Sequence, residues 1–320
     1  MKKATKVILG TTAAAAAFSF GGGYVIFNEV MNRNAPIFPL ISAKASKSMQ
    51  NVQLDETVDP RIQWLNEQEY QEYEIINSRN FRLKAHMIPA AEPSKKFVFC
   101  SHGYRCHGRR EFRLMAKFWH DNGFNVFMID HQAHGDSDGK YIGFGYHESL
   151  DGLLWLKFML EKFGDDIEIV LHGVSMGSAT VMMMTGAHDL PANVKFTVAD
   201  CGYTSCTAEF EHCLKDYIHL PNFPLLYTAD LFNRTLNGFD FNDVAPIESV
   251  GRAKIPMLFV HGDADDFVPT YMVHQVYSAC SSDYKDLLLV KGAGHAESYA
   301  KDPDSYNEKL SEFIDKFITK

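Results

Sequence analysis

A serine between two glycines is the first feature of the chain whose residue types and spacing point to chemistry. Residues 173–177 are Gly-Val-Ser-Met-Gly, between the apolar run Ile167–Leu171 and a second apolar stretch that begins at Ala179. A sharp turn from strand to helix leaves room only for glycine beside such a serine, and it exposes the hydroxyl above the sheet. A serine hydroxyl is a poor nucleophile without a base. We therefore predict that Ser175 is a nucleophile served by a base and an acid elsewhere in the chain.

The base is predicted in the last loop of the chain. His295 follows the apolar run Leu287–Val290 and directly follows Gly292-Ala293-Gly294. A strand-turn-helix nucleophile is expected to be followed along the chain by the acid and then by the histidine. His295 is therefore the predicted general base.

The acid is predicted between the serine and the histidine. The apolar run Met257–Val260 is followed by the spacing H-G-x-x-D-x-x-V-P, in which the central acid is Asp265. Its neighbours Asp263 and Asp266 are interpreted as turn-forming or solvated carboxylates. Asp200, which follows the preceding apolar run, is the alternative acid.

Two backbone amides are predicted to stabilise an oxyanion. One is the N–H of Met176, directly after the nucleophile, and the other is the N–H of Tyr104 in the loop after the run Phe97–Cys100. Tyr203 and Phe267 are predicted to line an apolar substrate pocket. This set of groups predicts acyl transfer through an acyl-enzyme, a reaction that needs no cofactor.

The elements that must position these residues form an alternating pattern. Eight short apolar runs are typical of strands: Tyr73–Ile76, Phe81–Ile88, Phe97–Cys100, Asn125–Ile129, Ile167–Leu171, Phe196–Ala199, Met257–Val260 and Leu287–Val290. Amphipathic stretches lie between them: Phe112–Asn122, Ser149–Phe163, Met272–Cys280 and Ser305–Ile318. Strands that alternate with helices predict an α/β protein with a doubly wound, mostly parallel eight-stranded sheet. The stretch Thr204–Val250 interrupts this alternation of strands and helices and predicts a helical cap over the sheet.

No metal site is expected. Four residues that lie close together in sequence, Cys100, His102, Cys106 and His107, lack the spacing of known zinc sites. The six cysteines do not form a small disulfide scaffold in a chain of this size, and buried free thiols are the favoured interpretation. A disulfide outside the cell remains an alternative.

The composition excludes several classes of protein. Of the 320 residues, 46% are hydrophobic and 22% are charged. These fractions are ordinary for a globular protein and do not fit a disordered, collagen-like or multi-span membrane chain. The net charge of −9 argues against nucleic acid as a partner, because phosphate binding favours a basic face.

The N-terminal segment predicts a membrane anchor. Three lysines, at positions 2, 3 and 6, precede the 21 uncharged residues Val7–Phe27, and a helix of that length can cross about 30 Å of hydrocarbon. The lysines keep the N-terminus in the cytoplasm, which places the catalytic domain outside the cell membrane. A signal peptide cleaved near Ala13–Ala17 and a buried helix rich in alanine and glycine are the alternatives. The predicted domains are an anchor (1–30), a connector (31–69) and a catalytic domain (70–320) with the cap at about 204–250.

Five motifs in fixed order give the chain a family resemblance over about residues 70–318. They are His102-Gly103, Asp130…His134-Gly135-x-Ser137-x-Gly139, Gly173-Val174-Ser175-Met176-Gly177, His261-Gly262-x-x-Asp265-x-x-Val268-Pro269 and Gly294-His295. Together they resemble the α/β-hydrolase superfamily. Within it, the chain is similar to membrane-anchored or cell-surface serine hydrolases of Gram-positive bacteria, related to serine aminopeptidase-like and cinnamoyl-ester-type enzymes. One departure is Gln132, which stands where relatives often have an arginine that braces neighbouring loops.

The expected function is carboxylic ester hydrolysis by Ser175, His295 and Asp265. A peptidase acting on short peptides is the close alternative, and for it Glu209, Glu211 or Glu297 are candidate anchors of a peptide terminus. A surface binding protein that kept the fold without catalysis is the third hypothesis.

Overall fold

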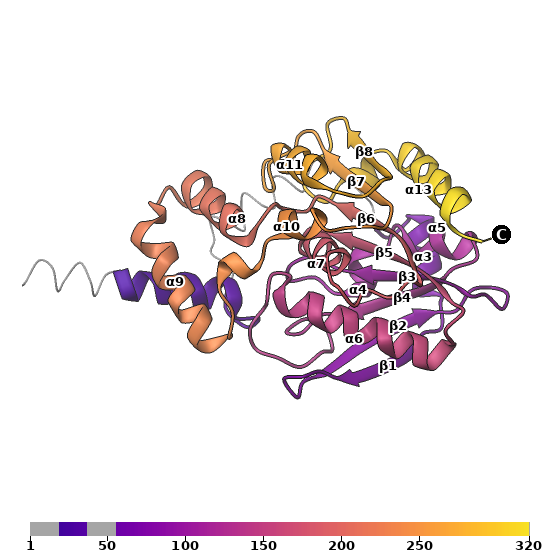
Figure 1. Ribbon diagram of the computed structural model, residues 1–320, viewed down its shortest axis with the longest axis horizontal. Helices are drawn as coiled ribbons and strands as arrows, with labels where there is room; N and C mark the ends of the chain where they lie inside the picture. The colour runs from indigo at the N-terminus through magenta and orange to yellow at the C-terminus, as the bar shows by residue number, and fades with distance from the viewer. Residues whose placement is uncertain (1–18, 37–55, 320) are drawn as a thin grey trace, which may run out of the picture.

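The computed structural model describes residues 19–36 and 56–319. Its centre is one eight-stranded sheet with the order β1-β2-β4-β3-β5-β6-β7-β8 (Figure 1). The strands are β1 (Gln71–Ile76), β2 (Arg82–Ile88), β3 (Lys96–Ser101), β4 (Asn125–Asp130), β5 (Glu168–Val174), β6 (Val194–Asp200), β7 (Met257–Gly262) and β8 (Lys285–Val290). Strand β2 pairs antiparallel with β1 and β4, and every other pair is parallel. The predicted doubly wound, mostly parallel sheet is confirmed.

Helices cover both faces of the sheet because its central strands are apolar on both sides. On β3, Val98 and Cys100 face one core cluster, whereas Phe97 and Phe99 face another, as the two-residue period of a strand requires. One face packs against α3 (Pro60–Asn66), α5 (Ala116–Asp121) and α13 (Pro303–Phe317). The other face packs against α6 (Tyr146–Phe163), α7 (Met176–Thr185), α10 (Pro246–Val250) and α11 (Tyr271–Ala279). Two short helices, α4 (Gly108–Glu111) and α12 (Ser298–Lys301), lie in loops.

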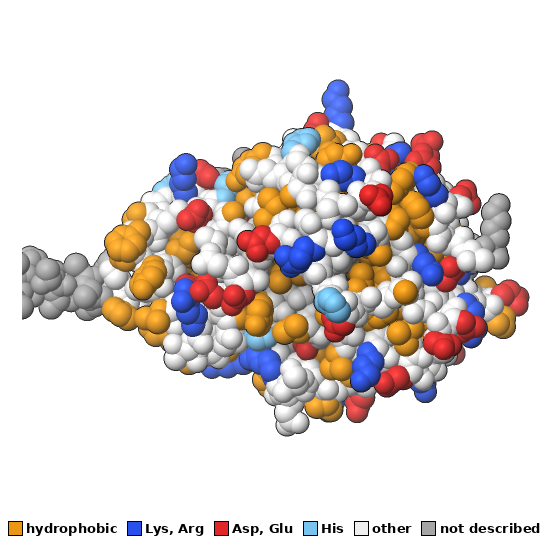
Figure 2. All heavy atoms as spheres, viewed as in Figure 1, with side chains coloured by type: hydrophobic (Ala, Val, Ile, Leu, Met, Phe, Trp, Pro, Cys, Tyr) orange, Lys and Arg blue, Asp and Glu red, His pale blue; other side chains and the backbone are white. Residues whose placement is uncertain are grey.

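The predicted cap is present between β6 and β7. It contains α8 (Cys206–His212), a π-helical turn η1 (Cys213–Ile218), α9 (Asn222–Leu236) and a 3₁₀ turn η2 (Phe241–Asp243), and α10 ends it. The cap occupies one end of the molecule, and hydrophobic side chains are exposed on the surface there (Figure 2). On α9 these include Phe223, Tyr227 and Leu231, which are 78%, 65% and 43% exposed.

A helix over the described residues 19–31, the N-terminal helix, lies beside α9 (Figure 1). It contains the last part of the segment predicted as a membrane span, and residues 7–18 of that segment lie outside the described residues. None of the helices within the described ranges combines the length and the apolar character that crossing a membrane requires. The side chains of Phe27 and Met31 are buried against the cap and its neighbouring loops.

Candidate active site

The turn between β5 and α7 holds Ser175 in the conformation that the glycine spacing predicts. Ser175 has φ 56° and ψ −117°, a left-handed conformation that a side chain rarely adopts. A Cβ at Gly173 would lie 2.2 Å from the carbonyl oxygen of Gly177, and a Cβ at Gly177 would lie 1.9 Å from that of Ser101. Only glycine therefore fits on either side. The Ser175 N–H donates to the carbonyl of Asp200 at 2.9 Å, which ties the turn to the neighbouring strand β6.

Three loops at the carboxyl edge of the sheet bring the predicted nucleophile, base and acid together. Nε2 of His295 lies 2.8 Å from Oγ of Ser175, and Nδ1 of His295 lies 2.8 Å from Oδ2 of Asp265. The other oxygen of Asp265 accepts the backbone N–H groups of Phe267 at 3.0 Å and Val268 at 2.9 Å. The carboxylate is thus held in position by its own loop while it orients the imidazole.

The acid and the base are both buried, and each changes the pKa of the other. Burial opposes the ionisation of Asp265, but His295 and a contact from His261 outweigh burial and hold the pKa of Asp265 well below its usual value. Burial also disfavours the imidazolium of His295, yet the Asp265 carboxylate outweighs it and raises the pKa of His295 well above its usual value. The pair therefore stabilises a positive charge on the imidazole, which is the charge that a general base acquires.

The alternative acid, Asp200, has different partners. Its Oδ2 accepts the hydroxyl of Tyr306 at 3.0 Å, and its Oδ1 has no hydrogen-bond partner among the described residues. Burial raises the pKa of Asp200 to about 7. The Tyr306 oxygen also lies 3.0 Å from Nε2 of His172, whose Nδ1 accepts the indole N–H of Trp119 at 3.1 Å. Asp200 belongs to this buried network, which no local sequence pattern indicates because its members lie in four separate elements.

The two predicted oxyanion donors come from two segments: Tyr104 lies in the loop after β3, and Met176 is the first residue of α7. Within the described residues, neither the N–H of Tyr104 nor that of Met176 donates a hydrogen bond to another group of the chain. His102 braces this loop: Nδ1 contacts the carbonyl of Gly103 at 2.8 Å, and Nε2 accepts the N–H of His131 at 3.0 Å. Both free amides can therefore donate to an oxygen that carries developing charge.

An apolar pocket of about 80 Å³ opens at Ser175. The predicted residues Tyr203 and Phe267 line it, together with Tyr104, Phe144 and Phe210. Most of this lining comes from the cap and from the ends of strands, as the position of the cap over the sheet predicts. Three further lining residues, Ile26, Glu29 and Val30, belong to the N-terminal helix and were not anticipated.

Of the three glutamates considered as anchors, one lies in the pocket wall. Glu209 is only 4% exposed, its Oε1 accepts the thiol of Cys213 at 3.4 Å, and its Oε2 has no hydrogen-bond partner among the described residues. Burial raises the pKa of Glu209 to about 8. Glu211 is exposed to solvent, and Glu297 accepts the N–H of Gly294 beside the predicted base.

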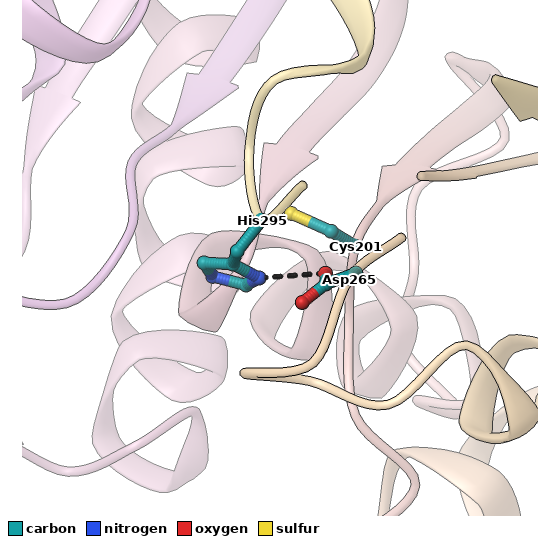
Figure 3. A group of neighbouring side chains, drawn as sticks. All are labelled: Cys201, Asp265 and His295. Carbon is teal, nitrogen blue, oxygen red and sulfur yellow. Dashed lines mark hydrogen bonds and ion pairs between the residues drawn. The ribbon is translucent and has the colours of Figure 1, made fainter. Parts of the chain in front are cut away.

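Cys201 lies close to the acid and the base, as Figure 3 shows. One potential ligand atom from each of Cys201, Asp265 and His295 lies within 4.8 Å of the others. Asp265 and Nδ1 of His295 are, however, already hydrogen-bonded to each other, so a metal ion there would compete with the orientation of the base. All six cysteines are free thiols, in agreement with the favoured interpretation of the sequence.

The comparisons with known proteins agree with this architecture. Residues 92–203 match the family model described as serine aminopeptidase, S33. A solved structure of the Pyrococcus furiosus esterase Pf2001 superimposes with a TM-score of 0.64, covering 80% of this chain and 94% of that one at 22% sequence identity. The chain therefore has the α/β-hydrolase fold, and its residues 92–203 are similar to the serine aminopeptidase family.

Two other proteins match this chain over most of their own length. The chain is 28% identical over 241 residues to the uncharacterized protein YqkD of Bacillus subtilis, a match that spans 75% of this chain and 78% of that one. A thermostable carboxyl esterase from Bacillus coagulans, solved in complex with glycerol, has a TM-score of 0.60 at 17% identity and covers 78% of this chain and 99% of that one. At these identities the solved structures establish the shared fold.

Proposed function

We propose that the protein is a serine hydrolase that cleaves carboxylic esters through an acyl-enzyme. The observation that carries the proposal is the continuous chain of hydrogen bonds from Asp265 through His295 to Oγ of Ser175, which ends at the mouth of an apolar pocket. A fold alone would not support an activity, whereas a nucleophile, a base and an orienting acid within hydrogen-bond distance define a reaction class.

In the first half of the reaction, Oγ of Ser175 attacks the ester carbonyl and Nε2 of His295 takes the serine proton. Asp265 stabilises the imidazolium, and the N–H groups of Tyr104 and Met176 donate to the oxyanion of the tetrahedral intermediate. When this intermediate collapses, the imidazolium gives its proton to the departing alcohol and Ser175 remains acylated. Water, deprotonated by the same imidazole, then releases the acid and restores the serine.

The pocket lining supports an ester with an apolar acyl group, because aromatic and aliphatic side chains surround most of it. Amide hydrolysis is the second candidate, and Glu209 is the observation that favours it. A carboxyl group in the pocket wall with an unpartnered oxygen can accept a hydrogen bond from the amino group of an aminoacyl substrate, whose positive charge would lower the raised pKa of Glu209.

The test begins with a fluorophosphonate probe, which labels an activated serine covalently. We expect the wild-type protein to react and Ser175→Ala to be inert. Ser178→Ala is the matched control: Ser178 lies in α7, directly after the turn that holds Ser175, is buried, and its hydroxyl has no partner among the described residues. An unreactive wild-type protein, or labelling that survives Ser175→Ala, would show that the proposed chemistry is wrong.

A rate panel then separates the two substrate classes. The panel compares p-nitrophenyl esters of increasing acyl length with aminoacyl p-nitroanilides, using kcat/KM. Ester hydrolysis predicts faster turnover of the esters relative to their uncatalysed rates. Faster anilide turnover that depends on Glu209 would favour the peptidase alternative instead.

A further inference from the structure

The N-terminal helix forms one wall of the pocket beside Ser175. Ile26, Glu29 and Val30 from this helix line the same cavity as Ser175, and Phe210 and Ile218 of the cap contribute further lining. Three segments far apart in sequence therefore meet around one hydroxyl. The role of a membrane-anchor stem does not require side chains in this cavity.

The C-terminal end of the helix is held by the loop that presents the oxyanion donor. The guanidinium of Arg105 donates to the carbonyls of Glu29 at 2.8 Å, Asn32 at 2.9 Å and Ala35 at 2.7 Å. The neighbouring Tyr104 hydroxyl donates to the carbonyl of Val30 at 2.8 Å. The last carbonyls of a helix lack partners within the helix, and a cation there also complements the helix dipole. Adjacent residues of one loop thus hold the helix and offer an N–H to the oxyanion.

The rest of the helix packs closely on α9 of the cap. A Cβ at Gly23 would lie 2.0 Å from Oγ1 of Thr228, so glycine is what lets the two helices approach each other. The ring of Phe232 on α9 contacts the rings of Tyr24 and Phe27, with centroids 5.3 Å and 6.4 Å apart. The helix is therefore part of the packed structure along the whole of its described length (Figure 1).

We propose that the N-terminal helix is a working part of the catalytic domain and limits the length of the acyl group that the pocket accepts. This inference rests on the ester hydrolysis proposed above and assigns its substrate class. A cavity of about 150 Å³ holds a molecule the size of benzene. The pocket of about 80 Å³ therefore suits a short acyl chain rather than the acyl chains of membrane lipids.

The decisive variants change the pocket wall formed by the N-terminal helix and leave Ser175, Asp265 and His295 unchanged. Ile26→Ala and Val30→Ala enlarge the pocket, and Ile26→Phe narrows it. Val25→Ala is the matched control, because Val25 is adjacent on the same helix but is 45% exposed and does not line the cavity. Each full-length variant is assayed with p-nitrophenyl butyrate, hexanoate, octanoate and decanoate.

For the wild type we expect the highest kcat/KM with butyrate or hexanoate. Space for one methylene group changes such selectivity by roughly 10- to 200-fold. The octanoate-to-butyrate ratio should therefore rise about tenfold or more in Ile26→Ala and Val30→Ala, fall in Ile26→Phe, and stay unchanged in Val25→Ala.

The failure of this inference can be distinguished from failure of the proposed function. If the wild type hydrolyses esters but the ratio is the same in all four variants, the helix does not limit acyl length and the inference is wrong. A wild-type preference for decanoate would overturn it as well. If the wild type hydrolyses no ester and does not react with a fluorophosphonate, the proposed function has failed, and the inference fails with it.

Discussion

Replacing Glu209 by glutamine should raise the free energy of unfolding, and the difference from the wild type should increase with pH. The side chain is almost fully buried, and burial raises its pKa from the ordinary value of 4.5 to about 8. At neutral pH the carboxyl group is thus protonated in the folded protein and ionised in the unfolded chain. Because the folded state binds the additional proton, the free energy of unfolding falls as the pH rises between these two pKa values.

The size of the effect follows from the pKa difference. Between pH 5 and pH 7, each pH unit removes up to about 1.4 kcal/mol of stability, so the wild type loses about 3 kcal/mol through this one group. Glutamine has nearly the same shape, can accept the same thiol hydrogen bond from Cys213, and does not titrate. Wild type and Glu209→Gln should therefore have similar stability near pH 4.5 to 5. At pH 7 the free energy of unfolding of the variant should exceed that of the wild type by about 3 kcal/mol, which corresponds to roughly 5–10 °C in Tm.

The assay is urea or thermal unfolding of both proteins at pH 5, 6, 7 and 8. All other titrating groups are shared, so their contributions cancel in the difference between the two curves. Glu211→Gln on the same helix is the control, because Glu211 is exposed and its replacement should change the free energy of unfolding only slightly. Parallel curves for wild type and Glu209→Gln would refute the reasoning, since they would show that the group ionises freely in the folded state.

Three further predictions follow from the site and the sequence. Asp265 raises the pKa of His295 above its usual 6.5, and catalysis needs the neutral imidazole, so kcat/KM should rise with pH through an apparent pKa above 6.5. The substitution Asp265→Asn should lower that apparent pKa and reduce turnover by about 10⁴-fold. A pH–rate profile already at its plateau at pH 6 would contradict this. Gly177→Ala should destabilise the protein by about 3 kcal/mol or more and abolish turnover, because its Cβ would lie 1.9 Å from the Ser101 carbonyl oxygen; an unchanged Tm beside wild type would contradict it. On the sequence evidence for an anchor, the full-length protein should sediment with membranes and a variant without residues 1–18 should not; full-length protein of intact mass that stays in the supernatant without detergent would exclude the anchor.

Local sequence patterns were enough to predict the sheet and the turn that carries Ser175. Central strands of a parallel sheet are buried on both faces, so they appear as short unbroken apolar runs, and all eight predicted runs form strands. The steric demand on Gly173 is equally local, because a Cβ there would meet the carbonyl of Gly177 four residues later. These features depend on neighbours within a few residues, which a sequence displays directly.

Features that depend on burial and on distance through space could not be predicted from local sequence patterns. Asp200 and Asp265 both follow strands that lie between the serine and the histidine in the sequence. Only the folded chain shows that Asp265 contacts His295. Asp200 instead contacts Tyr306. Glu209 has no sequence signal that separates it from the exposed Glu211 two positions later. The uncharged residues near the N-terminus are equally compatible with lipid and with a protein surface, since both offer an apolar environment. The fold is what puts the helix of residues 19–31 against α9 and the pocket, because close packing between distant segments is a property of the whole chain.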